Sequence, residues 1–288
     1  MACNDIEQRL KNLRNEKQDL EEGMELVTYP KTLAIMQANL DNLKAQIAAE
    51  EKNLADCKAI ENPPPPRPFV VRVKDIFCSE ASNEIGVDEP YLLIASVDML
   101  RLVQVQIDPL PAGLVPPVRI PAVHCFKVGP WSGVKPGTRH PATELTSINN
   151  PRFWDLSGLA KKVASPQDVI FVVGVFENDG SSPEAIRLAL EPAMELSLAL
   201  NLGLEYSALA ATLVSDMKGT FDTARLLGLG PAHLNADDRI DVEQLNLTTI
   251  DLDTINALGK HEKTQTFTLT NKSGKITNQY TVTFSFEV

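Results

Sequence analysis

The sequence predicts a mainly β protein, an antiparallel β-sandwich with a helical insertion, preceded by an antiparallel α-helical hairpin. In the segment before residue 63, apolar residues recur at spacings of three and four. Residues 63–68, PPPPRP, cannot continue a helix and favour an extended linker. Beyond them, short β-branched stretches are separated by Pro, Gly, Asn and Asp, without alternating helices. We therefore expect a hairpin at 1–62, a proline-rich linker at 63–68, and a β-sandwich at 69–288.

The hairpin is predicted from two segments that share a heptad seam. Gly23 and the stretch Thr28 to Pro30 interrupt the pattern, and proline is favoured at the start of a helix. The seam positions are Ile6, Leu10, Leu13, Leu20 and Met24 in the first segment, and Leu33, Met36, Leu40, Leu43, Ile47, Leu54 and Cys57 in the second. Such a seam serves an intramolecular hairpin or an arm for homo-oligomerisation, and both alternatives stay open.

The cysteines bear on the hairpin rather than on a zinc site. Folding the two segments back on each other brings Cys3 opposite Cys57. We expect two buried thiols there in a cytosol, and a disulfide in an oxidising compartment. Cys3, Cys57, Cys78 and Cys125 include no Cys-x-x-Cys pair, so the sequence does not indicate zinc or thioredoxin-like chemistry.

Six stretches from residue 69 onward have the composition of strands. They are residues 69–73, 91–97, 102–107, 169–176, 267–270 and 280–286. The final stretch, YTVTFSF, alternates in a way that places it inside a sheet. Asp251 and Asp253 are expected to be turn or surface acids.

A helical insertion is expected at about 183–230. Two apolar stripes run through it, Ile186, Leu190, Met194, Leu198 and Leu202 in one, and Leu209, Leu213, Met217 and Phe221 in the other. Charged residues such as Glu195 and Asp216 interrupt the segment. We expect the stripes to pack against the sandwich, with membrane insertion as the alternative.

Residues 83–94, NEIGVDEPYLLI, resemble the signature of the C-two domain, a calcium-dependent lipid-binding β-sandwich. In that family an Asp, two spacers and a Gly lead to Ser-Asp-Pro-Tyr and a strand. Asn83 stands at the first Asp position, Asp88 at the Ser position and Glu89 at the second Asp position. Two later segments follow in the family's order, residues 172–179 (VVGVFEND) and 237–241 (DDRID).

The resemblance covers residues 69–288 apart from the insertion, and it implies a C-two-like fold with a Ca²⁺ site. The implied ligands are Asn83, Glu89, Glu177, Asp179, Asp237 and Asp238. Ca²⁺ takes about six to eight oxygen ligands from carboxylates, amides and carbonyls. Asn in place of Asp removes a charge, and Glu in place of Asp moves the oxygens outward, so we expect a weaker or altered site. The alternative is a set of solvated loop acids and turn formers on a domain without a metal.

The Gly- and Pro-rich stretch 128–137 predicts a loop that contains Trp131. We expect this Trp to hold the loop against the core, with contact to lipid or sugar as the alternative.

Enzyme motifs are not found in the sequence. There is no Gly-x-Ser-x-Gly, no His-Glu-x-x-His and no phosphate-binding glycine loop. His124, His140, His233 and His261 lie in separate contexts. His124 and Cys125, as neighbours on a strand, would point to opposite faces. We therefore expect a protein without enzymatic activity.

Charge narrows the choice of partner and location. The formal net charge of -11 argues against nucleic acid, and it repels anionic lipid unless a cation intervenes. The N-terminus has no basic region followed by an apolar run, and no window reaches the ~18 apolar residues of a membrane span. We expect a cytoplasmic protein, with peripheral membrane association and leaderless export left open.

These observations predict a binding protein. Its acidic loop end is expected to bind a membrane surface or a protein partner, with or without Ca²⁺. One alternative is a structural protein that oligomerises through the hairpin. Another is a toxin-like protein whose helical insertion enters membranes.

Overall fold

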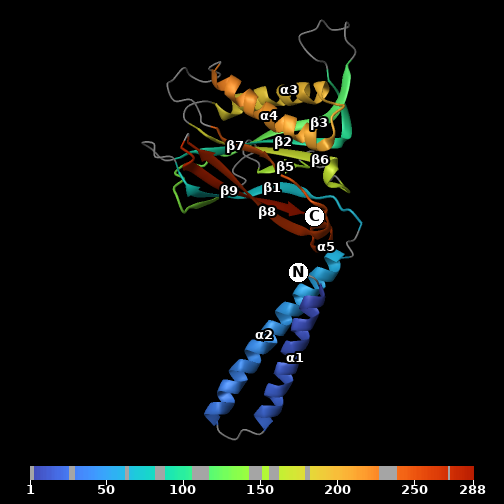
Figure 1. Ribbon diagram of the computed structural model, residues 1–288, viewed down its shortest axis with the longest axis vertical. Coiled ribbons are helices and arrows are strands. Elements are labelled where there is room, and N and C mark those ends of the chain that lie inside the picture. The colour runs from blue at the N-terminus through green and yellow to red at the C-terminus, as the bar shows by residue number, and fades with distance from the viewer. Residues whose placement is uncertain are drawn as a thin grey trace. The chain divides into compact units, whose positions relative to one another are not determined.

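The computed structural model of the chain describes residues 3–25, 30–61, 65–81, 88–105, 117–142, 151–155, 162–178, 182–226, 239–271 and 273–288. The chain divides into two units, Met1–Pro65 with Asp253–Gly259, and Pro66–Leu252 with Lys260–Val288. Figure 1 shows the elements of both units in chain order. Each unit is described separately below.

The first unit contains the predicted hairpin, formed by α1 (Cys3–Glu25) and α2 (Pro30–Glu61). The seam is most buried at Ile6 and Leu10 on α1, and at Leu40 and Leu43 on α2. Leu33, which the heptad pattern assigns to the seam, is exposed. Ion pairs run alongside the seam and join Arg9 to Glu50, Arg14 to Glu51 and Lys58 to Glu7. The helices therefore pack on each other within the chain.

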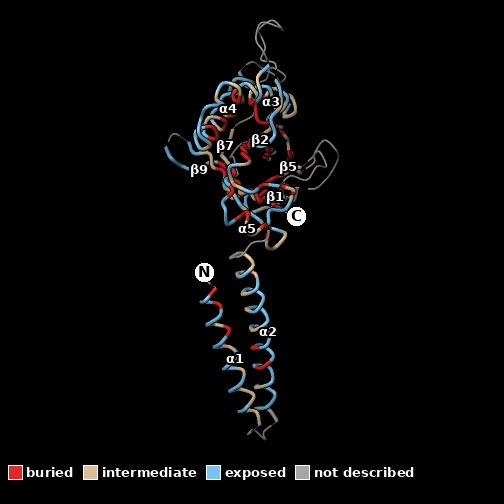
Figure 2. The backbone as a smooth tube through the Cα atoms, turned by 90° about the vertical axis from the view of Figure 1, so that its right-hand side faces the viewer, coloured by how far each residue is buried: buried red, intermediate tan, exposed pale blue. Residues whose placement is uncertain are grey.

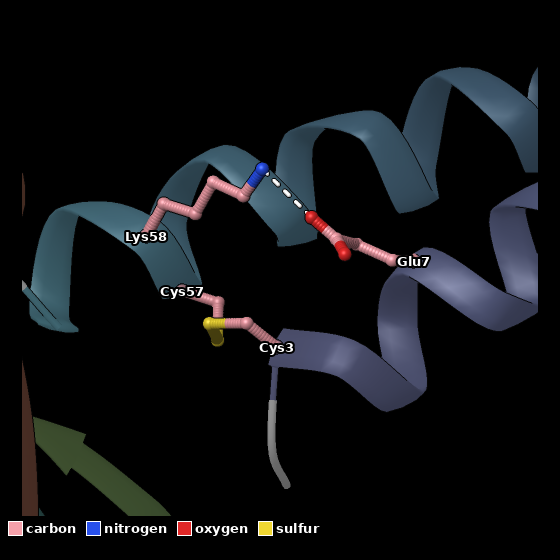
Figure 3. The surroundings of a disulfide bond; sticks show 4 residues. All are labelled: Cys3, Glu7, Cys57 and Lys58. Carbon is pink, nitrogen blue, oxygen red and sulfur yellow. Dashed lines mark ion pairs between the residues drawn. A yellow bond between two sulfur atoms is a disulfide. The ribbon is translucent and has the colours of Figure 1, made fainter.

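A disulfide joins the two helices of the hairpin between Cys3 and Cys57, with their Cα atoms 5.8 Å apart (Figure 3). An ion pair between Lys58 Nζ and Glu7 Oε1, at 2.8 Å, lies beside the disulfide; Lys58 follows Cys57 directly, and Glu7 is one helical turn after Cys3. Of the two alternatives for these cysteines, the structure has the disulfide rather than free thiols. The sequence spacing therefore predicts that the two cysteines lie opposite each other. It does not predict whether they are oxidised, because that depends on the compartment.

The second unit is a sandwich of two antiparallel sheets (Figure 1). One sheet has the order β4-β1-β9-β8, with β5 also paired to β1; its strands are Arg139–Pro141, Val70–Glu80, Ile276–Glu287, Lys260–Thr270 and Arg152–Trp154. The other has the order β3-β2-β6-β7; its strands are Val118–Val128, Pro90–Val105, Val169–Glu177 and Arg239–Gln244. Between the sheets, the ring of Phe153 lies edge-on to Phe171 at 5.3 Å and to Phe284 at 5.9 Å. The predicted fold class, a sandwich with helical additions and an N-terminal hairpin, is confirmed.

Several strands differ from the sequence-based expectation. The stretches expected at 91–97 and from 102 onward form one strand, β2, whose register with β3 shifts between Asp98 and Leu102. Strands β3 and β7 were not expected, because their sequences mix Pro, His or charged residues with the apolar ones. The final strand, β9, pairs with both β1 and β8 and is central to its sheet, as predicted.

The helical insertion consists of α3 (Pro183–Leu200) and α4 (Tyr206–Leu226), which cover the outer face of the β3-β2-β6-β7 sheet. Figure 2 shows their buried residues on the side toward the sheet. Every described member of the two predicted stripes is buried except Leu202, which follows the end of α3 and is exposed. Gly174 of β6 leaves room for this packing, because a Cβ there would meet the Phe176 ring at 2.4 Å.

Of the two expectations for this helical segment, packing against the sandwich is the one that the structure shows. None of the helices described here combines the length and the apolar character that crossing a bilayer requires.

A short helix, α5 (Thr249–Leu258), connects β7 to β8. At its start, the Thr248 N–H donates to Asp251 Oδ2 at 2.8 Å, and the Asp251 N–H donates to Thr248 Oγ1 at 3.2 Å. Lys263 Nζ donates to the same carboxylate at 2.6 Å. Asp251 is therefore a buried capping residue and not the turn or surface acid expected from the sequence.

Candidate functional site

The start of β2 and the end of β6 bring two of the predicted ligands to one end of the sheet. Pro90 pairs with Glu177 across these strands. One step further out, the Asn178 N–H donates to the Glu89 carbonyl at 3.2 Å and extends the ladder. Glu89 and Glu177 therefore lie on neighbouring strands at the same end of the sandwich.

Their side chains nevertheless point to opposite faces of the sheet. Successive residues of a strand alternate in direction, and directly paired residues share a face. Asp88 and Glu177 point toward the facing sheet, where their partners are Tyr280 and Asn278 of β9. Glu89 and Asn178 occupy the other face and bond to each other, with Asn178 Nδ2 donating to Glu89 Oε2 at 3.2 Å.

The inner face holds a buried polar cluster between the two sheets. The Tyr280 hydroxyl donates to Asp88 Oδ2 at 2.5 Å, and Asn278 Nδ2 donates to Glu177 Oε2 at 3.4 Å. Asp88 is 4% exposed and Glu177 is 5% exposed, and Cys78 lies fully buried with them. Hydrogen bonds of this kind are required when carboxylates are buried, since an unsatisfied buried charge is very costly.

The electrostatics of this cluster keep its weak acids protonated. Burial, followed by the negative charge of Asp88, raises the pKa of the Cys78 thiol to about 11. Burial and then the hydrogen bond to Asp88 raise the pKa of Tyr280 far above its usual range. Cys78 is therefore an unreactive thiol, and Tyr280 is a permanent hydrogen-bond donor at neutral pH.

A loop between β3 and β4 closes over the inner cluster. The Val134 N–H donates to the Asp88 carbonyl at 3.2 Å, and the Trp131 N–H donates to the Pro90 carbonyl at 2.9 Å. The Trp131 ring also donates, from Nε1 to the Pro141 carbonyl at 3.2 Å. Gly129 precedes a cis peptide to Pro130 and has a φ of 92°, a conformation that favours glycine. Trp131 thus holds the loop in place, as expected.

In the pair formed by Glu89 and Asn178 on the other face of the sheet, one acceptor oxygen lacks a hydrogen bond. Asn178 Oδ1 is buried and has no hydrogen-bond partner among the described residues. Its amide nitrogen is fixed by Glu89, so the oxygen has a defined orientation. Amide and carboxylate oxygens are the ligand types that Ca²⁺ takes.

The other four predicted ligands, Asn83, Asp179, Asp237 and Asp238, lie outside the described residues. In the part of the chain that the structure describes, no three His, Cys, Asp or Glu side chains form a group that could hold a metal ion. The predicted set of six therefore stays a prediction.

His124 and Cys125 are neighbours on β3 that differ in burial. Cys125 is buried under α3, and burial raises its pKa well above the ordinary value. His124, its neighbour, has a half-exposed side chain that lies 3.7 Å from Glu191.

Sequence reasoning missed Asn178, Asn278 and Tyr280. Asn178 could have been predicted as a site residue, because it stands between the two predicted ligands Glu177 and Asp179. Asn278 and Tyr280 belong to the last strand, 101 residues or more from their partners, and only the pairing of sheets brings them to the site.

A comparison with protein-family models finds no match, and a comparison with curated protein sequences finds none. Among solved structures, the chain is similar to one described as the C2A domain of plant Extended Synaptotagmin 1. That alignment has a TM-score of 0.24 and 9% identity, and it covers 78% of this chain and 97% of the other.

The chain is also similar to a structure titled "CC2D1B coordinates ESRCT-III activity during the mitotic reformation of the nuclear envelope". Here the TM-score is 0.26 and the identity 8%, with 99% of this chain and 88% of the other covered. Because both TM-scores are low, the alignments define no shared site geometry.

Proposed function

We propose that the chain is a binding protein whose acidic loop end holds Ca²⁺ and thereby engages an anionic membrane surface. The observation that carries this proposal is Asn178, whose buried Oδ1 lacks a donor while its Nδ2 is held by Glu89. A buried acceptor without a partner is costly, and a cation shared with the Glu89 carboxylate would remove that cost.

The residues around this pair supply further oxygen ligands of the right kind. Asp179 follows Asn178 in the chain, and Asn83 belongs to the segment that leads to Asp88 and Glu89. Asp237 and Asp238 immediately precede Arg239, which pairs with Phe176 near the end of β6. We assign Glu177 to the support of the site rather than to the shell, because it faces the inner cluster with Asp88.

Charge explains why a cation would matter for membrane binding. A chain with a formal net charge of -11 is repelled by anionic lipid headgroups. When bound, Ca²⁺ would supply positive charge at the loop end, within the short range over which lipid phosphates are felt. Lipid binding then depends on Ca²⁺, and a protein partner is the other outcome that the experiments below distinguish.

The metal is tested by thermal melting of protein first stripped with chelator. A ligand that binds only the folded state stabilises it by about 2.7 kcal/mol at a concentration 100-fold above its Kd. We expect Ca²⁺ to raise the melting temperature and Glu89→Gln to reduce that rise. Glu262→Gln is the matched control, because Glu262 is an exposed acid on the other sheet, paired with Lys74. An unchanged melting temperature at millimolar Ca²⁺ would refute the site.

The membrane is tested by co-sedimentation with phosphatidylserine vesicles. We expect the protein to pellet with Ca²⁺ and to stay in the supernatant with chelator or with neutral vesicles. If Ca²⁺ raises the melting temperature but the protein does not pellet, the Ca²⁺ site is supported, and a protein partner takes the place of the membrane in the proposed function.

An assembly role for the hairpin is the second candidate function. It is favoured by the apolar residues Leu33 and Ile35, which are 39% and 64% exposed near the start of α2. Light scattering should give a multiple of the 31.5 kDa chain mass if the hairpin assembles, and Ile35→Glu should return it to that mass. A monomer at high concentration would exclude this role.

A further inference from the structure

The outward side of the helical insertion carries a groove of about 650 Å³ between α3 and α4. It lies on the side of both helices that faces away from the sheet, since the opposite side supplies the buried stripes. The α3 wall is formed by Ala189, Ala193, Leu196, Ser197, Leu200 and Asn201, and the α4 wall by Thr212, Asp216, Gly219, Thr220 and Thr223.

The α3 wall is mostly apolar, and its leucines are exposed. Leu196 is 42% exposed and Leu200 is 72% exposed, and Leu188 continues the same surface one turn before Pro192 at 58%. None of the charged residues of α3 lines the groove. Arg187 pairs with Glu184, and Glu191 faces His124 of β3. The leucine surface is therefore separate from the acidic flank of the same helix.

The α4 wall is polar and carries one carboxylate. Asp216 accepts a hydrogen bond from the buried Ser197 hydroxyl at 2.5 Å, which fixes the carboxylate across the groove. The hydroxyls of Thr212 and Thr223 donate to carbonyls of their own helix. The described lining of the groove thus presents a negative charge and contains no Lys, Arg or His.

The charge of the whole insertion has the same sign. Residues 183–226 contain six acids, Glu184, Glu191, Glu195, Glu205, Asp216 and Asp222, and three bases, Arg187, Lys218 and Arg225. Lys218 is paired with Asp241. Arg239 of β7 pairs with Asp222 and offsets one of these acids. The remaining excess of acids favours a cationic partner over anionic lipid.

We propose that this groove docks an amphipathic, basic helix of a partner protein. The apolar stripe of that helix packs on Leu196 and Leu200, and a Lys or Arg on the adjacent face bonds to Asp216. Ala189, Ala193 and Gly219 have small side chains, which let a helix backbone approach closely. From Ala189 to Leu200 the wall is about 16 Å long at ~1.5 Å per residue, which suits about three turns of a partner helix. This inference does not depend on the Ca²⁺ proposal.

The test uses a fluorescein-labelled helical peptide of ~15 residues, with leucines at helical spacing on one face and lysines beside them. A peptide of the same composition in scrambled order is the control for general attraction to an acidic protein. Fluorescence anisotropy with the full chain is expected to show saturable binding of the amphipathic peptide and weaker binding of the scrambled one.

Leu200→Glu is expected to weaken binding at least about tenfold, as loss of a central contact does. The substitution adds a negative charge, so non-specific attraction of a basic peptide would increase. A loss of peptide affinity in this variant therefore cannot result from non-specific attraction, which would increase the affinity. Leu100→Glu is the matched control, because Leu100 is a leucine on β2 with 66% exposure and no part in the groove. It should not weaken binding.

Two further variants separate the charge from the shape. Asp216→Asn keeps the side-chain size and should weaken binding by about threefold to tenfold, with a smaller dependence on salt concentration. Ala193→Leu fills the groove and should weaken binding without changing its salt dependence. Melting curves show whether each variant is folded, and any one folded variant suffices for the test.

Three results would overturn the proposal. The first is equal binding by the folded wild type and Leu200→Glu. The second is a dimer in light scattering that Leu200→Glu dissociates, because it assigns the groove to a second copy of the chain. The third is pelleting with phosphatidylserine vesicles that Leu200→Glu abolishes, because it assigns the leucine surface to lipid.

Discussion

The protein contains two helix pairs that are stabilised in different ways. In the hairpin, α1 and α2 bury a short seam and are joined by ion pairs and the Cys3–Cys57 disulfide. In the insertion, α3 and α4 bury Leu, Met and Phe side chains on a sheet and have neither cysteine nor cross-link between them. Helices gain most of their stability from packing an amphipathic face, so a pair with a small seam needs further support.

The difference also determines which surface each pair presents. Ion pairs between α1 and α2 line the flanks of the hairpin seam. The insertion buries one face of each helix on the sheet, and leucines on its outer side are exposed to solvent. Both pairs therefore expose apolar side chains, Leu33 and Ile35 on α2 and Leu196 and Leu200 on α3, but only in the insertion do they lie outside a core packed on a sheet. The following variants test this comparison.

The largest effect is expected from removing an aromatic side chain of the insertion core. The Phe221 ring stacks on Phe176 of the sheet at 4.3 Å and is 2% exposed. Phe221→Ala should lower the free energy of unfolding by about 4 kcal/mol, measured by urea denaturation. Leu200→Ala, on the exposed side, should change it by less than ~0.5 kcal/mol. A loss for Phe221→Ala below ~1 kcal/mol would show that the insertion does not depend on this core.

Breaking the disulfide should weaken the hairpin by about 3 kcal/mol. The bond closes a loop with a sequence separation of 54, which restricts the unfolded chain. Cys3→Ser with Cys57→Ser should speed amide hydrogen exchange in α1 and α2 and leave α3 and α4 unchanged. Hydrogen exchange in the oxidised wild type is the reference. Equal acceleration in both pairs would contradict the separation of the two units.

Ser197→Ala should cost about 1.5 kcal/mol, because it removes a hydrogen bond to the Asp216 carboxylate between α3 and α4. Thr212→Ala is the control, since its exposed hydroxyl bonds only to the Ala208 carbonyl of its own helix. Chemical denaturation of both variants measures the difference. An equal effect of the two substitutions would argue that the Ser197–Asp216 bond does not hold the pair together.

The smallest effect is expected from replacing Glu195, and this replacement should stabilise the folded state. Burial, and then the negative charge of Glu191, raise the pKa of Glu195 in the folded state. A raised carboxylate pKa means that ionisation costs folded-state stability at pH values above it. Glu195→Gln should therefore raise the melting temperature slightly at pH 7, by at most a few tenths of a kcal/mol. The gain should vanish as the pH falls below about 4, where both side chains are neutral; a gain that persists there has another cause.

Local pattern was sufficient to predict the hairpin, the insertion and the sandwich class. The periodicity of Leu190 and Met194 in α3, and of Leu213 in α4, is visible within each helix and predicts their burial correctly. Strand β3 was missed because Pro121 and His124 interrupt its apolar run, although Pro121 lies where the register with β2 shifts. Strand boundaries depend on partners that are distant in the sequence, and propensity alone does not contain them.

The candidate site was predictable as a place but not as a set of contacts. Glu89 and Glu177 lie at the same end of the sandwich, but their side chains point to opposite faces of the sheet. Their opposite orientation follows from alternation, which requires the register of β2 with β6 to be known. The partners of Asp88 and Glu177 come from β9, so only the closure of the sandwich identifies them.

The disulfide has a mechanical consequence. A force that pulls on the chain before Cys3 and after Cys57 passes through the sulfur bridge and bypasses the residues between them. The helices inside this covalent loop carry no load while the bond is intact. Reduction would place them in the line of force and add up to about 190 Å of extensible chain, at ~3.5 Å for each of the 54 residues of separation.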